Sequence, residues 1–159
     1  MNWQEFIDLA RRLVSAPWAD GLHQTQLRLA VGAAYYAMYH ALTRSNADLR
    51  SFVGDSSWER TLPEWQRVYM ALVGDDAWRR MRADFSAHPE NIRRFVNVFL
   101  GVHERCLLAE EDPTAVFSPA EVQEWVQRAE GAIMACWSVE PAHRRAFALR
   151  VLLERPTTD

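Results

Sequence analysis

The chain has 159 residues, of which 49% are hydrophobic and 25% are charged, and its formal net charge is −3 at pH 7. This composition excludes a disordered chain, and no apolar run approaches the roughly 18 residues that a membrane span needs, so we expect one globular domain. All 18 basic residues are arginines, but the 21 acidic residues argue against a general polyanion-binding surface. Any contact with RNA must therefore be confined to a local patch.

The cysteines and the first residues of the chain indicate a cytoplasmic protein. Cys106 and Cys136 each lie on an apolar helical stripe, which favours reduced core thiols over a disulfide. The N-terminal residues include acids and lack the small-residue cleavage site of a secretory signal. No His or Cys pair has metal-ligand spacing and no Gly-rich phosphate loop occurs, so we expect no metal and no cofactor.

The first predicted helix runs from Trp3 to about Ser15. Asn2 followed by Glu5 has the form of a capping box at its start. Residues 16–22, which contain a proline and a glycine, are expected to form the connector to the next helix. The apolar stripe of the first helix consists of Trp3, Phe6, Ile7, Ala10, Leu13 and Val14.

A long central helix is predicted from His23 to about Val53, with Gly54 ending it. One stripe of this helix is ordinary core and consists of Leu27, Ala30, Val31, Ala34, Met38, Ala41 and Leu42. The opposite side carries Leu29, Ala33, Tyr36 and His40. Such a helix is expected to be buried on most sides, in a bundle or against a second subunit, with Gly32 allowing a neighbouring helix to approach closely.

Two short helices are expected between the central helix and the next long one. Thr61 and Glu64 form a second capping box at the start of the first. That helix should stop at Gly74 and bury Trp65, Val68, Tyr69 and Leu72. The second should run from Asp75 to about Phe85, with Trp78 and Met81 on one side. Its remaining sides carry the richest local cluster of positive charge, which is Arg79, Arg80 and Arg82.

Two further long helices follow. Pro89 opens the first, which should reach about Ala109 and bury Ile92, Phe95, Val96, Phe99, Leu100, His103, Cys106 and Leu107. His103 therefore points into the core, whereas Arg105 points away from it. Ser118 and Pro119 mark the start of the second, whose stripe is Val122, Trp125, Val126, Ala129, Ile133, Cys136 and Trp137.

A last helix begins at Pro141 and carries Phe147, Leu149, Leu152 and Leu153. Because no segment shows convincing strand alternation, we predict an all-α fold, an antiparallel bundle of four or five principal helices with short extra helices. A single domain is expected over residues 1–155, with a frayed tail over residues 156–159.

The central helix also resembles a known family. Between Leu27 and Leu42 it reads Leu-Arg-x-Ala-x-x-x-Ala-Tyr-Tyr-Ala-x-aromatic-His-Ala-Leu, which resembles the start of HEPN superfamily domains, small helical bundles. Residues 65–72 and 92–113 are similar to later blocks of uncharacterised bacterial members. In length and order the resemblance covers nearly the whole chain. It implies a HEPN-like bundle that forms a homodimer.

The resemblance also implies a function. Many HEPN proteins are metal-independent ribonucleases in which an Arg and a following His line a cleft between two subunits. We therefore expect a protein that binds or cleaves RNA, of bacterial toxin–antitoxin or phage-defence type. The candidate catalytic residues are His40, Arg105 and Tyr36, and the candidate phosphate contacts are Arg28, Arg79, Arg80 and Arg82.

The chain departs from the family at that Arg-His pair. Aligned back from Asp112 and Pro113 without a gap, the pair falls on Cys106 and Leu107; with a one-residue insertion it falls on Arg105 and Cys106. Because the His is missing, enzyme activity is left open. The alternative is a non-catalytic HEPN domain that binds a nucleotidyltransferase-type partner or a nucleotide. A third reading is a generic helical bundle in which the tyrosines and His40 only pack and the arginines only face solvent.

Overall fold

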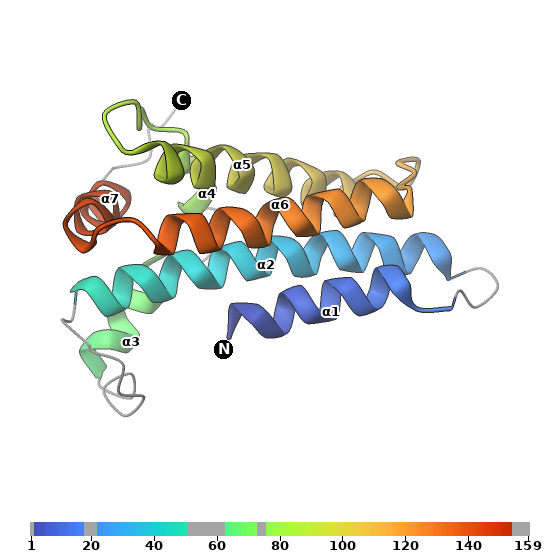
Figure 1. Ribbon diagram of the computed structural model, residues 1–159. Coiled ribbons are helices and arrows are strands. Elements are labelled where there is room, and N and C mark those ends of the chain that lie inside the picture. The colour runs from blue at the N-terminus through green and yellow to red at the C-terminus, as the bar shows by residue number, and fades with distance from the viewer. Residues whose placement is uncertain (1, 18–21, 51–62, 73–75, 154–159) are drawn as a thin grey trace.

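Figure 1 shows a computed structural model of the chain, which describes residues 2–17, 22–50, 63–72 and 76–153. Within these ranges the chain is helix, turn and loop without a strand, so the all-α prediction is confirmed. The helices are α1 (Trp3–Ser15), α2 (His23–Arg50), α3 (Pro63–Tyr69), the 3-10 helix η2 (Met70–Leu72), α4 (Asp76–Met81), α5 (Glu90–Glu111), α6 (Pro119–Trp137) and α7 (Pro141–Leu153). The predictions at Val53, Gly54, Thr61, Gly74 and Asp75 fall outside the described residues, as does the tail.

Helices α1, α2, α5 and α6 pack lengthwise, and each runs opposite to the one before it (Figure 1). α2 is the central element, since it packs on α1, α5 and α6 and also contacts α3 and α7. Full burial of a Leu or Met side chain contributes about 2 kcal/mol, so a buried stripe on this helix holds the bundle together. The predicted core stripe of α2 is confirmed, because every side chain in it is at most 2% exposed: Leu27, Ala30, Val31, Ala34, Met38, Ala41 and Leu42.

The opposite side of α2 is covered at Ala33, which is 5% exposed, and at half-buried His40, but it is less covered than predicted at the other two positions. Leu29 is 58% exposed and Tyr36 is 46% exposed. A Cβ added at Gly32 would meet nothing within 4 Å among the described residues, so the expected approach of a helix to Gly32 is wrong within this chain. The close approach occurs at Gly101 of α5 instead, where an added Cβ would lie 2.8 Å from the ring of Trp125 on α6.

The helix starts at α1 and α6 lie where the sequence predicts them. Asn2 caps α1 by accepting a 3.3 Å hydrogen bond from the backbone N–H of Gln4, one residue earlier than in a capping box. Ser118 caps α6 by accepting a 3.2 Å hydrogen bond from the N–H of Glu121. A side-chain cap of this kind typically stabilises a helix by about 1 kcal/mol.

The buried faces of α5 and α7 differ from the predicted stripes. On α5 Leu107 is exposed, while Val98 and Val102 are buried. α5 packs against α2 and α6 at once, which widens its buried face beyond one stripe. On α7 Leu149 and Leu153 are exposed, because the face that meets α2 and α4 carries Phe147, Ala148 and Val151.

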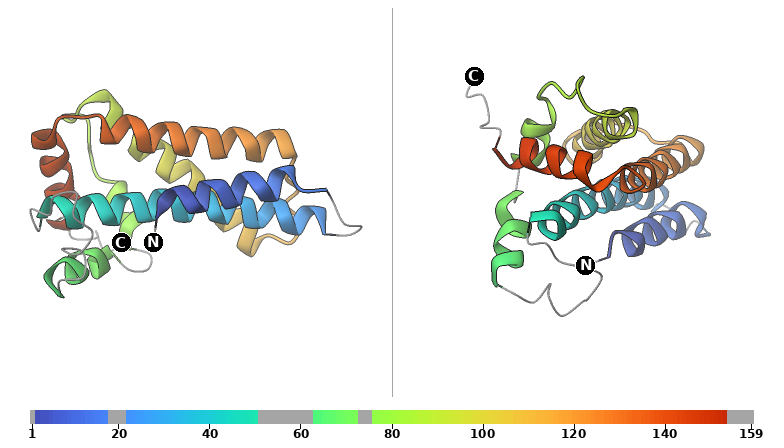
Figure 2. Two further views of the ribbon diagram at one scale, coloured as in Figure 1. Left: turned by 60° about the horizontal axis from the view of Figure 1, so that its bottom comes forward. Right: turned by 60° about the vertical axis from the view of Figure 1, so that its left-hand side comes forward.

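The shorter helices gather around the C-terminal half of α2 (Figure 2). α3 packs on α2, α4 packs on α5 and α7, and α7 crosses the end of the bundle. α4 ends at Met81 rather than near Phe85, although Phe85 is still buried. Trp65, Val68 and Tyr69 of α3 are half-buried rather than buried. No helix in the described ranges is long and apolar enough to cross a membrane.

Candidate functional site

His40 lies among aromatic rings at the contact between α1, α2 and α3. Its imidazole stacks on the Phe6 ring of α1, with ring centres 5.0 Å apart and planes 17° apart. Tyr69 of α3 stacks on it at 6.0 Å, and the Tyr69 hydroxyl shares a short hydrogen bond with Nδ1 of His40. On α2 itself, Tyr36 and Tyr39 lie 6.3 and 5.3 Å from the imidazole centre. Rings from three helices therefore hold His40 in place.

α3 is held against α2 by a polar contact beside these rings. Trp65 stacks on Tyr69 at 4.9 Å, and its indole N–H donates a 2.8 Å hydrogen bond to Oδ1 of Asp48. Asp48 also lies 3.8 Å from the guanidinium of Arg44, one turn earlier on α2. These contacts position the Tyr69 hydroxyl at His40.

A second histidine, His103 of α5, continues the row of rings. Tyr35 connects the two histidines, since its ring centre lies 5.7 Å from that of Tyr36 and 5.2 Å from that of His103. Trp78 of α4 stacks on His103 at 5.3 Å with planes 18° apart. We call the whole set the aromatic cluster: Phe6, Tyr35, Tyr36, Tyr39, His40, Trp65, Tyr69, Trp78 and His103.

The electrostatics of the aromatic cluster favour neutral side chains. Burial lowers the pKa of His40 below its ordinary value of 6.5, so its imidazole is neutral at pH 7. Burial, followed by the neighbouring Tyr69 and Tyr36, raises the pKa of Tyr39 and keeps that hydroxyl protonated. Tyr36 is 46% exposed, which gives the cluster access to solvent.

The structure brings two of the three candidate catalytic residues together. Tyr36 and His40 share the aromatic cluster, whereas Arg105 lies on the other face of α5. The Arg105 guanidinium is 3.7 Å from Glu121 and 5.7 Å from the ring centre of Trp125, both on α6. Residues two apart on a helix point about 160° apart, so a helix that turns His103 toward α2 must turn Arg105 away.

The four candidate phosphate contacts fall into two groups. Arg28 donates hydrogen bonds to the backbone carbonyls of Ala109, Asp112 and Ala115, at 2.7, 2.9 and 2.6 Å. These carbonyls lie in the last turn of α5 and in the loop that follows it. Arg80 likewise donates to the carbonyls of Val151 and Leu152 at the end of α7. Arg80, and Arg28 at Ala109, satisfy carbonyls that helix ends leave unpaired, and Arg28 also ties the loop after α5 to α2.

Arg79 and Arg82 are placed differently. Their guanidinium groups lie 5.7 and 5.2 Å from the centre of the Trp78 ring, at one end of the aromatic cluster. Both side chains are exposed. Of the four predicted arginines, these two are therefore the ones beside the candidate site.

The cysteines and the possible metal ligands of the described ranges do not form a second reactive centre. Cys106 and Cys136 are buried free thiols, and burial raises the pKa of Cys106 to about 12 and that of Cys136 to about 11. Within the described ranges no three His, Cys, Asp or Glu side chains gather as metal ligands would.

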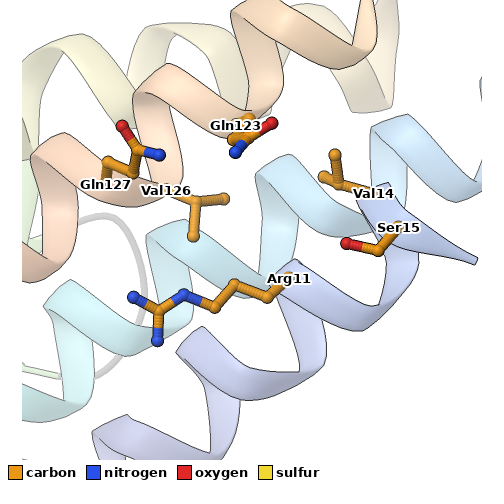
Figure 3. Close-up of a pocket in the computed structure, with 6 residues that line it drawn as sticks. All are labelled: Arg11, Val14, Ser15, Gln123, Val126 and Gln127. Carbon is orange, nitrogen blue, oxygen red and sulfur yellow. The ribbon is translucent and has the colours of Figure 1, made fainter.

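A small pocket lies between α1 and α6 (Figure 3). Its volume is about 190 Å³, below the roughly 300 Å³ at which ligand pockets begin. Arg11 on its wall pairs with Glu130. The pocket is lined by Arg11, Val14, Ser15, Gln123, Val126 and Gln127.

Sequence reasoning missed the second half of the aromatic cluster. It placed His103 in the core and Trp78 on a short helix without connecting them to Tyr35. The available signal was the Tyr-Tyr pair, because neighbouring residues on a helix point about 100° apart and can contact two different helices. The partners of each tyrosine depend on how α3, α4 and α5 pack on α2.

We compared the chain with models of known protein families, with curated proteins and with solved structures, and none of the three comparisons found a match.

Proposed function

We propose that this protein is a HEPN-like RNA-binding protein and that single-stranded RNA binds at the aromatic cluster. The observation that carries the proposal is the setting of His40, a half-buried imidazole in a row of stacked rings that reaches solvent at Tyr36. Stacking of a base on an aromatic side chain contributes about 1–3 kcal/mol and needs no metal. Arg79 and Arg82 supply positive charge for a phosphate at the Trp78 end.

The HEPN-like bundle and its biological setting belong to the same proposal. It is supported by the central position of α2 and by the location of its Tyr-Tyr-Ala-x-Tyr-His segment at the contact with α3. A toxin–antitoxin or phage-defence role follows from the resemblance of that segment. A gene for an antitoxin or a nucleotidyltransferase beside the gene for this chain would support that role.

RNA cleavage would require His40 to act as a general base. In the tautomer whose Nδ1 N–H donates to the Tyr69 hydroxyl, Nε2 carries the lone pair that would take a proton from a ribose 2′-hydroxyl. Arg105 contacts α6, so charge on the phosphate would have to be neutralised by Arg79, by Arg82 or by a second copy of the chain. The contacts of a single copy therefore favour binding over cleavage.

The second candidate function is a non-catalytic module that binds another protein, such as a nucleotidyltransferase-type partner. Leu29 and Tyr36 favour it, because both are exposed and lie seven residues apart on one side of α2. Gly32 lies between them with open space beside it. An exposed apolar surface of this kind commonly marks a contact with another protein.

Binding of a fluorescent single-stranded RNA in EDTA, followed by anisotropy, tests the first proposal. Tyr36→Ala and His40→Ala should each weaken binding by about tenfold, which corresponds to the loss of one stacking contact. Leu29→Ala is the matched control, since Leu29 is exposed on the same side of the same helix. Binding that is absent, or unchanged in both variants, would favour the interaction module.

Gel analysis of the same RNA separates cleavage from binding. Wild type, His40→Ala and Arg105→Ala are incubated with RNA without metal. Loss of cleavage in His40→Ala alone would make His40 the base, whereas equal cleavage by all three proteins would remove both residues from the site. Binding without cleavage by wild type is the result that the geometry favours.

A further inference from the structure

A groove lined by arginines lies between α5 and α6, away from the aromatic cluster. It has a volume of about 560 Å³, and its lining residues are Glu90, Arg93, Arg94, Asn97, Val98 and Arg128. α1 and α3 lie on other sides of the bundle from α5 (Figures 1 and 2). On α5 itself Arg94 and His103 point to opposite sides, since nine residues correspond to about 180° around a helix. The groove is therefore a separate surface, which none of the sequence motifs indicated.

The arginines reach the groove from two facing helices. Arg93 and Arg94 come from the first half of α5, and both side chains are exposed. A terminal nitrogen of Arg94 lies 3.7 Å from the position of a Cβ built at Gly131, so the Arg94 side chain reaches the surface of α6. Arg128 lies three residues before Gly131, on the same side of α6. The Arg94 and Arg128 side chains therefore approach the groove from its two walls.

The positive charge in this groove is only partly compensated. Among the lining residues three arginines face a single acid, Glu90. Neither the Arg93 nor the Arg94 guanidinium forms a hydrogen bond or an ion pair with another residue in the described ranges. Arg128 stacks 4.4 Å from the Trp125 ring centre and has an exposed contact of 3.7 Å with Glu124. Like charges brought together in this way repel one another, and a bound anion would relieve that repulsion.

We propose that this groove binds a phosphate-bearing ligand. Guanidinium groups offer planar pairs of donors that match phosphate oxygens, and several of them around one groove suit a ligand with more than one phosphate. Asn97 lies four residues after Arg93 on the same side of α5 and adds an amide donor. A volume of about 560 Å³ is within the range of ligand sites.

Binding experiments with two ligands distinguish between two possible sources of these phosphates. Inorganic tripolyphosphate, titrated by calorimetry, represents a small polyphosphate, and a fluorescent single-stranded RNA represents a nucleic-acid backbone. Arg94→Gln and Arg128→Gln should each weaken binding by about tenfold, the effect of one lost charged hydrogen bond. Weaker binding of both ligands would indicate a general phosphate site, and weaker binding of RNA alone would identify the backbone as the ligand.

Controls keep this test independent of folding and of the aromatic cluster. Arg12→Gln makes the same charge change at an exposed position on α1 and should bind as wild type does. Tyr36→Ala should bind tripolyphosphate normally, so failure of the RNA proposal would not affect this one. Circular dichroism verifies that each variant is folded. The proposal is overturned if neither ligand binds saturably, or if Arg94→Gln and Arg128→Gln bind both as tightly as Arg12→Gln.

Discussion

The protonation state of His40 is set by the side chains that surround it. Phe6 and Tyr69 remove much of the water that would solvate a charged imidazole, and burial therefore lowers its pKa. In the same setting, Nδ1 of the imidazole shares a hydrogen bond with the Tyr69 hydroxyl. A histidine in this setting suits base stacking and proton transfer, and its role as a proton acceptor depends on its remaining neutral at physiological pH.

This setting predicts a loss of stability in acid. Because the pKa of His40 is lower in the folded chain than its ordinary value of 6.5, the unfolded chain binds more protons as the pH falls below that value. We expect Tm, measured by circular dichroism, to decrease between about pH 7 and pH 5. The Tm of His40→Gln should decrease less over this range. Part of the decrease that remains should come from His88, because burial also lowers the pKa of its imidazole. If Tm decreased as much in His40→Gln as in wild type, the folded structure would not lower the pKa of His40.

Residue type alone does not show which arginines are free to contact a phosphate. Arg28 and Arg80 carry the same group as Arg79 and Arg82, yet they donate to backbone carbonyls at helix ends. Arg94, which no motif singled out, lines an open groove and reaches the surface of α6. The difference lies in which groups each guanidinium meets after the helices have packed.

At the scale of helices, the contact between α5 and α6 depends on a residue without a side chain. Gly101 faces Trp125, whose ring comes so close that a Cβ at Gly101 would lie 2.8 Å from it. Arg105 and Arg128 lie near the same indole, with guanidinium centres 5.7 and 4.4 Å from its ring centre. A Cβ added at Gly32 on α2, by contrast, would lie in open space.

The two glycines should therefore respond oppositely to alanine. Gly101→Ala should lower the free energy of unfolding by about 1–2 kcal/mol, because overpacking against Trp125 outweighs the gain in helix propensity. Gly32→Ala should raise it by about 0.5–1 kcal/mol, since only the propensity gain applies. Urea unfolding measures both values. If Gly101→Ala were as stable as Gly32→Ala, the ring of Trp125 would have to move aside at no cost.

At the scale of the whole molecule, one side of the central helix remains open. α1, α5 and α6 cover the core stripe of α2, but the side with Leu29, Gly32 and Tyr36 faces solvent in a single copy. The homodimer that the resemblance implies stays a prediction. A second copy packed against Leu29 would bury that side chain, with Tyr36 at the edge of the contact and still open to RNA.

Size-exclusion chromatography with light scattering tests the dimer. We expect wild type to be dimeric at micromolar concentration and Leu29→Glu to be monomeric, because a charge at the centre of an apolar contact opposes association. Leu107→Glu on α5 is the matched control, as Leu107 is also exposed. Dissociation caused by Leu107→Glu instead would place the contact on α5, and monomeric wild type would contradict the dimer altogether.

Local pattern was sufficient to predict which segments are helical and much of the core, although not every helix end. The apolar spacing of α2 identified its buried stripe, and the caps at Asn2 and Ser118 marked two helix starts. Both signals depend on residues within one or two turns of the same helix, so they can be recognised without knowing which other helices pack against it. The opposite orientations of His103 and Arg105 followed in the same way from the helical turn.

Only the tertiary structure decided which side chains meet. The stacking of His40 on Phe6, its bond to Tyr69 and the link through Tyr35 to His103 and Trp78 join residues of α1, α2, α3, α4 and α5. The arginine groove and the contact at Gly101 likewise depend on how α5 lies against α6. Helical periodicity specifies the direction of a side chain from its own axis, but the neighbour it finds there depends on the packing of other helices.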